Sequence, residues 1–171
     1  MTLASLVPLL LLAQGVMGGL DTLLNHELIE RLPYRPEARN EIGLHAIREA
    51  IYGTLFLAFA WFEWHGAAAL LIALLLAAEV LVTATDEFIE NRIRVLPQNE
   101  RVMHVFLTLN LGAIIAFLLP TLQDWGRLPA GLASTTHGWV SWVLSGLALT
   151  ALAWSVRDAR AWFTLGARRR A

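Results

Sequence analysis

Five long apolar stretches constrain this chain more than any other feature of its sequence. They cover residues 3–25, 46–65, 67–85, 102–122 and 138–156, and a helix of roughly 20 residues crosses a hydrocarbon layer of about 30 Å. Hydrophobic residues make up 57% of the 171 residues and charged residues 16%, which is more apolar side chain than a soluble domain hides. The sequence therefore predicts an all-α integral membrane protein, a single domain over residues 1–171 with five transmembrane helices in the lipid bilayer.

The arginines predict how these helices are oriented. Of the 13 basic residues, all of them arginine, only Arg127 falls on one side of the expected membrane, and the other twelve, the tail Arg168–Arg170 included, fall on the opposite side. The positive-inside rule then places the N-terminus outside and the C-terminus in the cytoplasm. Arginine without lysine suggests a GC-rich bacterial genome, so we expect the bacterial cytoplasmic membrane. The first stretch has no positively charged start and continues into a polar helix, so we expect a retained helix and not a signal peptide.

Composition also excludes several kinds of site. The chain has no cysteine, which excludes disulfides and thiolate ligands. The net charge of −1 and the lack of a basic stripe argue against a nucleic-acid partner.

Two polar segments on the arginine-rich side resemble each other. Each consists of a short acidic run, a proline-containing loop, an Asn-Glu pair and a histidine: His26-Glu27-Leu28-Ile29-Glu30, Asn40-Glu41 and His45 in the first, and Asp86-Glu87-Phe88-Ile89-Glu90, Asn99-Glu100 and His104 in the second. Each joins a helix that descends to this side to one that rises from it. The pattern predicts tandem repeats over about 3–65 and 67–122, related by a two-fold axis along the membrane normal, with the fifth helix as an addition.

Helical spacing predicts which polar side chains converge. Glu41, His45 and Glu49 are four residues apart, as are His26 and Glu30, so each set should share a helix face. Four helices would then direct carboxylates and imidazoles to the bundle interior at one depth. Buried carboxylates need a positive partner, which is a metal ion, an arginine or a proton.

The ligand pattern resembles that of the ferritin-like di-iron carboxylate proteins, over about forty residues in two blocks. In those proteins two helices give a Glu each and two give a Glu with a His one turn later, whereas this chain has Glu-x-x-x-His twice. The resemblance implies two metal ions, iron first and manganese or zinc as alternatives. The candidate ligands are His26, Glu27, Glu30, Glu41, His45, Asp86, Glu87, Glu90, Glu100 and His104. By overall pattern the chain also resembles a group of small, uncharacterised bacterial multi-helix membrane proteins.

Simpler interpretations remain open for part of this set. Asn40 and Asn99 would also serve as helix N-caps, with Glu41 and Glu100 facing the positive end of the helix dipole. The other glutamates could pair with nearby arginines. Asp21 and Glu79 lie deeper than the rest, where a carboxylate needs a function or a buried partner.

These observations favour a membrane oxidoreductase at the cytoplasmic face, with Arg48 and Glu49 supplying charge or protons as candidate catalytic residues. A quinone, a lipid or another small hydrophobic molecule would reach it from the bilayer. A divalent-cation or proton transporter is a second hypothesis, although the outer helix halves are nearly free of polar groups. A b-type haem between His45 and His104 and a metal-free accessory subunit are further alternatives. Small residues of the fifth helix would allow packing on the bundle or in a homo-oligomer.

Overall fold

A computed structural model describes residues 6–168 of the chain, without the side chain of Arg168. The start of the first expected helix at residue 3 and the tail residues Arg169 and Arg170 lie outside this range. The predicted all-α membrane fold is confirmed, because five helical segments are long and apolar enough to cross a membrane: Val7–Ile29, Pro36–Trp61, Ala67–Ile93, Gln98–Gly126 and Trp139–Ala167.

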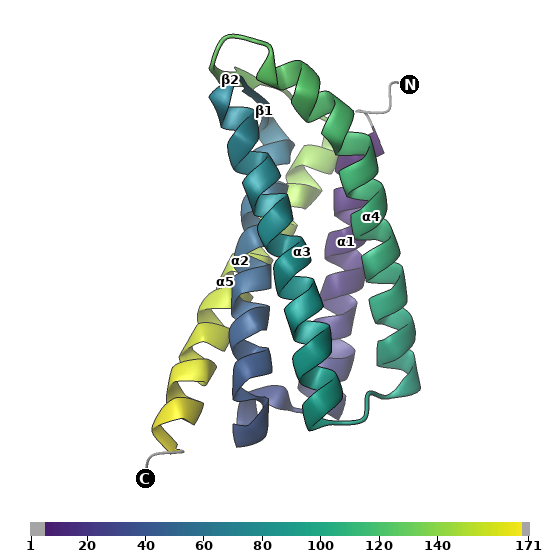
Figure 1. Cartoon of the computed structure of the whole chain (residues 1–171), viewed down its shortest axis with the longest axis vertical. Coiled ribbons are helices and arrows are strands. Elements are labelled where there is room, and N and C mark those ends of the chain that lie inside the picture. The colour runs from purple at the N-terminus through teal and green to yellow at the C-terminus, as the bar shows by residue number, and fades with distance from the viewer. Residues whose placement is uncertain (1–5, 169–171) are drawn as a thin grey trace.

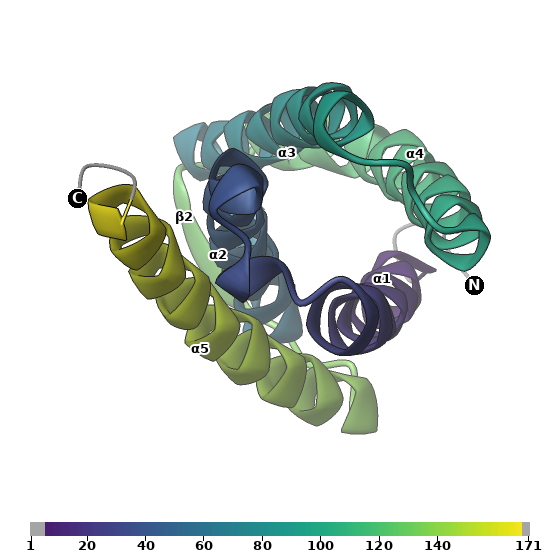
Figure 2. The same ribbon diagram turned by 90° about the horizontal axis from the view of Figure 1, so that it is seen from below.

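Four helical segments stand side by side in a ring (Figure 2). Going round, α1 (Val7–Asp21) contacts α2 (Arg39–Trp61), α2 contacts α3 (Ala67–Ile93), α3 contacts α4 (Gln98–Gly126) and α4 returns to α1. Helix α5 (Trp139–Arg168) lies outside the ring, against α2 and α1 (Figures 1 and 2). Ser155 of α5 donates to the backbone carbonyl of Ala46 at 2.7 Å, which fixes α5 to the outer face of α2.

Most of the helices extend beyond their apolar stretches. Helix α3 ends at Ile93, α4 begins at Gln98, and α5 runs to Arg168, whereas the apolar stretches end at 85, begin at 102 and end at 156. The extra turns are polar, and they carry much of the charged chemistry. Asn40 and Asn99 are each the second residue of their helix, so neither is an N-cap, and the cap positions belong to Ala38 and Pro97.

A π-helix, η2 (Thr22–Ile29), continues α1. In a π-helix the backbone amide of each residue donates to the carbonyl five residues earlier. The amide of Glu30 donates in this way to the carbonyl of Asn25 at 2.8 Å. Residues five apart therefore share a face, which places His26 beside Asp21. The expected His26–Glu30 face is wrong for this reason, because Glu30 turns away to Arg35. Two short 3-10 turns, η3 (Leu32–Tyr34) and η4 (Pro36–Ala38), then lead to α2.

The opposite end of the bundle carries two short strands, β1 (Phe62–His65) and β2 (Gly131–Ser134). They pair antiparallel, with Phe62 opposite Ser134 and His65 opposite Gly131 (Figure 1). The short connection between α2 and α3 is thus mostly strand, and it is paired with the α4–α5 connection. We call this the strand end and the opposite one the cluster end.

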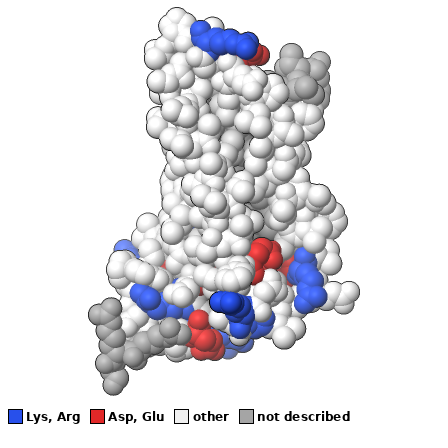
Figure 3. Space-filling view, in the orientation of Figure 1, with Lys and Arg blue, Asp and Glu red and all other residues white. Residues whose placement is uncertain are grey.

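The apolar core fills the half of the ring nearer the strand end. Its most deeply buried side chains include Leu55, Ile72, Ile114 and Leu144, each at most 1% exposed. Large apolar side chains also cover the outside, among them Leu81 and Leu109 at 69% and 67% exposure, as a lipid-facing surface requires. Figure 3 shows the consequence: an uncharged middle, with most charged side chains at the lower, cluster end.

Candidate metal centre

Charged and imidazole side chains from all four ring helices meet inside the cluster end. Asp21 and His26 come from α1 and η2, and His45 comes from α2. Asp86 and Glu90 come from α3, and Glu100 and His104 come from α4. We call this set the polar cluster: Asp21, His26, Glu41, His45, Arg48, Glu79, Asp86, Glu90, Arg94, Glu100 and His104. All its carboxylates are at most 4% exposed, so each one needs a positive partner.

Three histidines form the centre of the polar cluster. The rings of His26 and His45 stack, with centroids 4.3 Å apart and planes 10° apart. The ring of His104 lies edge-on to His26 at 6.5 Å. The expected convergence of these three imidazoles is thus present in the structure.

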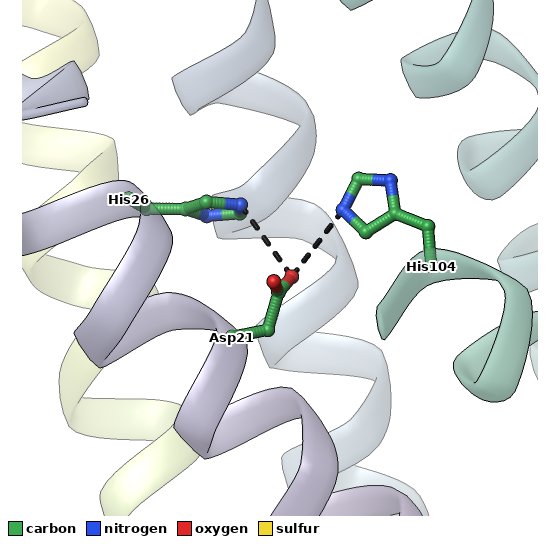
Figure 4. Close-up of side chains that lie close together, drawn as sticks. All are labelled: Asp21, His26 and His104. Carbon is green, nitrogen blue, oxygen red and sulfur yellow. Dashed lines mark ion pairs between the residues drawn. The ribbon is translucent and has the colours of Figure 1, made fainter. Parts of the chain in front are cut away.

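Asp21 lies between two of these rings (Figure 4). Its Oδ2 is 3.5 Å from Nε2 of His26 and 3.3 Å from Nε2 of His104. Asn25 donates to the other oxygen, Oδ1, at 2.7 Å, and Asn99 donates to Asn25 at 2.6 Å. This pair of amides orients the carboxylate, and the three ligand atoms are close enough together to hold one metal ion.

A second group uses the other nitrogen of the same histidine. Nδ1 of His104 is 3.1 Å from Oε1 of Glu87 and 3.1 Å from Oε1 of Glu90. These three residues also have ligand atoms close enough to share one ion. His104 therefore belongs to two candidate metal groups, one on each side of its ring.

Arg94 forms ion pairs with two of the expected ligands, Glu41 and Glu100. Its guanidinium donates to Oε1 of Glu41 at 2.8 Å and to Oε2 of Glu100 at 2.7 Å, and it lies 3.6 Å from Glu90. Burial lowers the pKa of Arg94, but its hydrogen bonds to Glu100 and Glu41 more than offset this and raise the pKa above its ordinary value. Glu41 and Glu100 are thus ion-paired, although Glu100 also approaches Nε2 of His26 at 3.4 Å.

Arg48 has the same role for a second set of carboxylates. It lies 3.0 Å from Oδ2 of Asp86 and 3.5 Å from Oε1 of Glu79, and Asp86 also contacts Nε2 of His45 at 3.2 Å. Glu49, the other expected catalytic residue, is not among these contacts. Its Oε2 is buried and has no hydrogen-bond partner among the described residues.

Six expected ligands lie outside both candidate groups: Glu41, His45, Asp86 and Glu100 within the polar cluster, and Glu27 and Glu30 outside it. Glu30 pairs with Arg35 at 2.7 Å, and Glu27 pairs with Arg157 of α5. Arg157 and its partner Asp158, which is 2% exposed, were not predicted, because the expected fifth helix stopped at residue 156. Asp21 was also absent from the predicted ligand set, although its depth in the membrane indicated a function or a buried partner.

With its carboxylates ionised and its imidazoles neutral, the polar cluster carries more negative than positive charge. Six carboxylates are buried: Asp21, Glu41, Glu79, Asp86, Glu90 and Glu100. Two arginines, Arg48 and Arg94, face them, which leaves an excess of four negative charges. Several nitrogen and oxygen atoms of the cluster also have no hydrogen-bond partner among the described residues, including Nε2 of all three histidines and both oxygens of Glu90.

The candidate metal groups are defined by this chain's own residues. Comparisons with protein families, with curated proteins and with solved structures gave no match. The chain has five helices suited to a membrane and buried Asp and His side chains that could hold a metal ion.

Proposed function

We propose that this protein holds two metal ions in the polar cluster and acts as a membrane oxidoreductase. The observation that carries the proposal is the position of His104, whose two ring nitrogens each face a separate group of ligand atoms. Both nitrogens could bind an ion only after the ring had lost its N–H proton, because a neutral imidazole has one free lone pair. Bound divalent cations would offset the excess of negative charge and would also give the unpartnered imidazole and carboxylate atoms their partners.

The donor set favours particular metals. Carboxylate oxygens and imidazole nitrogens suit iron, manganese and zinc, and copper(I) prefers the thiolates that this chain lacks. We place iron first, following the ligand pattern shared with the ferritin-like di-iron proteins. Iron or manganese, when bound, would supply electron-transfer chemistry. Zinc would not.

The surrounding residues have separate roles in this proposal. Asn25 and Asn99 orient Asp21, and such outer hydrogen bonds fix a ligand for its metal. Arg94 and Arg48 hold the carboxylates that lie farther out. Glu41 and Glu100, equivalent residues of the predicted repeat, both pair with the guanidinium of Arg94.

The location follows from the charge distribution. The polar cluster and most charged side chains share one end of the bundle (Figure 3). With the positive-inside rule, the centre would lie at the cytoplasmic face of a bacterial inner membrane.

The metal content of the purified protein tests the proposal. The protein is purified in mild detergent without chelators, and its metals are counted by mass spectrometry. We expect about two ions per chain, as in dinuclear carboxylate proteins, about one in His26→Ala, and none in His104→Ala, since His104 belongs to both groups. His65→Ala is the matched control, because His65 contacts Glu63 at the strand end. A folded wild type without stoichiometric metal would refute the metal centre.

Redox activity needs its own measurement. We expect the absorbance or paramagnetic spectrum of the wild type to change on anaerobic reduction and to return with an oxidant, and the His104→Ala variant to show neither change. If the wild type carries zinc alone, the metal centre stands and the oxidoreductase does not.

A metal-free accessory subunit is the second candidate, and the Arg94 and Arg48 ion pairs favour it. In that case histidine protonation would supply the missing positive charge. A stable wild type with no metal, in which His104→Ala lowers stability alone, would support this candidate.

A further inference from the structure

A cavity of about 180 Å³, open on one side, adjoins the polar cluster. At one end its wall includes Asp21, His26, His45 and His104. Apolar side chains of α2, α4 and α5 line the part that reaches toward the apolar core: Phe56, Leu107, Leu111 and Leu147. The cavity thus joins a polar end to an apolar extension, the shape that a molecule with a polar head and an apolar tail would fill.

The polar end has hydrogen-bond acceptors without donors. Oε2 of Glu49 and Oε2 of Glu79 are buried and have no hydrogen-bond partner among the described residues, and both glutamates line the cavity. A buried acceptor without a donor is destabilising. Hydroxyl groups of a ligand would donate to the two carboxylates, whereas the ionised carboxylate of an anionic lipid has no hydrogen to donate.

Aromatic side chains lie beside these acceptors. Tyr52 and Phe56 both line the cavity, with stacked rings whose centroids are 5.7 Å apart. The Tyr52 hydroxyl accepts a hydrogen bond from Gln14 at 2.9 Å, so its own proton is available to Glu79 or to a ligand oxygen. A flat aromatic head with oxygen substituents fits this wall better than a flexible alkyl chain does.

The mouth of the cavity faces the region that lipid would occupy. Its exposed border includes Gly19, Leu23 and Thr108, which belong to the membrane-spanning segments Val7–Ile29 and Gln98–Gly126. A Cβ on Gly19 would meet nothing within 4 Å, and one on Gly18 would meet only Leu107 at 4.0 Å. The two glycines therefore border open space, and a ligand would enter from the bilayer.

We infer that the cavity binds a quinol, an aromatic ring with two hydroxyl groups and an apolar tail. One hydroxyl donates to Glu49 and the other to Glu79, and the tail lies among the leucines toward the core. This inference rests on the proposed function, because the quinol would be the substrate of the same metal centre.

Direct binding tests this inference. Detergent-purified protein is equilibrated anaerobically with a benzoquinol that carries a decyl tail, and bound quinol is measured after gel filtration. We expect saturable binding of one quinol per chain and at least about tenfold weaker binding to Gly18→Leu, whose side chain enters the cavity. Gly112→Leu is the matched control, since this helical glycine of α4 also borders open space but does not line the cavity. Its affinity should equal that of the wild type.

Two comparisons identify the head group. Dodecanoate should compete poorly because its ionised head has no hydrogen to donate to the glutamates, and Glu49→Gln should weaken quinol binding by about tenfold or more. Absent saturable binding, unchanged affinity in Gly18→Leu, or equal competition by dodecanoate would each overturn the inference. Gly18→Leu must elute as the wild type does and retain its metal content; if it does not, Thr108→Phe, which fills the same mouth from α4, replaces it.

The metal count and the quinol-binding measurement test the two proposals separately. Quinol binding that depends on Gly18, in a protein without metal, would support the cavity and refute the metal centre. Two ions per chain without quinol binding would support the metal centre and refute the quinol alone.

Discussion

Replacing Arg94 by methionine should be among the most destabilising single changes in this chain. The Arg94 side chain is 8% exposed, and it serves Glu41 and Glu100, which are both 0% exposed. Removing one partner of a buried ion pair leaves an uncompensated buried charge and costs about 3–5 kcal/mol. Methionine keeps most of the apolar volume of the side chain, so the loss reflects charge rather than a cavity. We expect the free energy of unfolding of Arg94→Met to fall by this amount.

Equilibrium unfolding in mixed detergent micelles, followed by tryptophan fluorescence, measures the change. Arg127→Met is the control, because Arg127 and Asp124 are 78% and 76% exposed, and an exposed pair contributes about 1 kcal/mol or less. Adding Glu41→Gln and Glu100→Gln to Arg94→Met should restore most of the stability, since the buried charges are then gone. Should Arg94→Met unfold like Arg127→Met, the view of Arg94 as the counter-charge of this site would be refuted.

Three further substitutions probe the packing, each measured by the same unfolding assay. Gly53→Leu should lose about 1–3 kcal/mol by overpacking, because its Cβ would lie 2.7 Å from Leu152 of α5; wild-type stability would contradict the α2–α5 contact. Gly66→Ala should lose about 1–3 kcal/mol, because φ is +57° and the new Cβ would lie 2.6 Å from the Cα of Ala130. Asn110→Leu should lose about 1 kcal/mol, because its amide donates to two acceptors on α1; a gain in stability would show those hydrogen bonds to be dispensable.

The sequence predicted the membrane helices and the meeting of the three histidines, because both depend on regular helical periodicity. His45 and His104 each follow a glutamate by one α-helical turn, and the structure places both rings at the centre. The prediction for His26 depended on the same period and was only half right. His26 does reach the cluster, but the π-helix pairs it with Asp21 and not with Glu30.

The remaining differences arise where hydropathy carries no information. A polar helical extension and a polar loop have the same composition, so the last turns of α5 were missed, and with them Arg157 and Asp158. The choice between a metal and an arginine as partner of Glu41 could not be made from spacing, because Arg94 reaches that glutamate across 53 residues of chain. Strands of four residues such as β1 and β2 are too short to show an alternating pattern.

The pairing of β1 with β2 makes the bundle mechanically unequal at its two ends. It fastens the α2–α3 connection to the α4–α5 connection, whereas at the cluster end the α3–α4 connection has no strand partner among the described residues. The strand end is thus joined by backbone hydrogen bonds, which do not depend on the charge of any side chain. At the cluster end the α3–α4 connection is held by the side chain of Arg94, which pairs with Glu41 of α2. A change of charge in the polar cluster would therefore loosen the cluster end and leave the strand end joined.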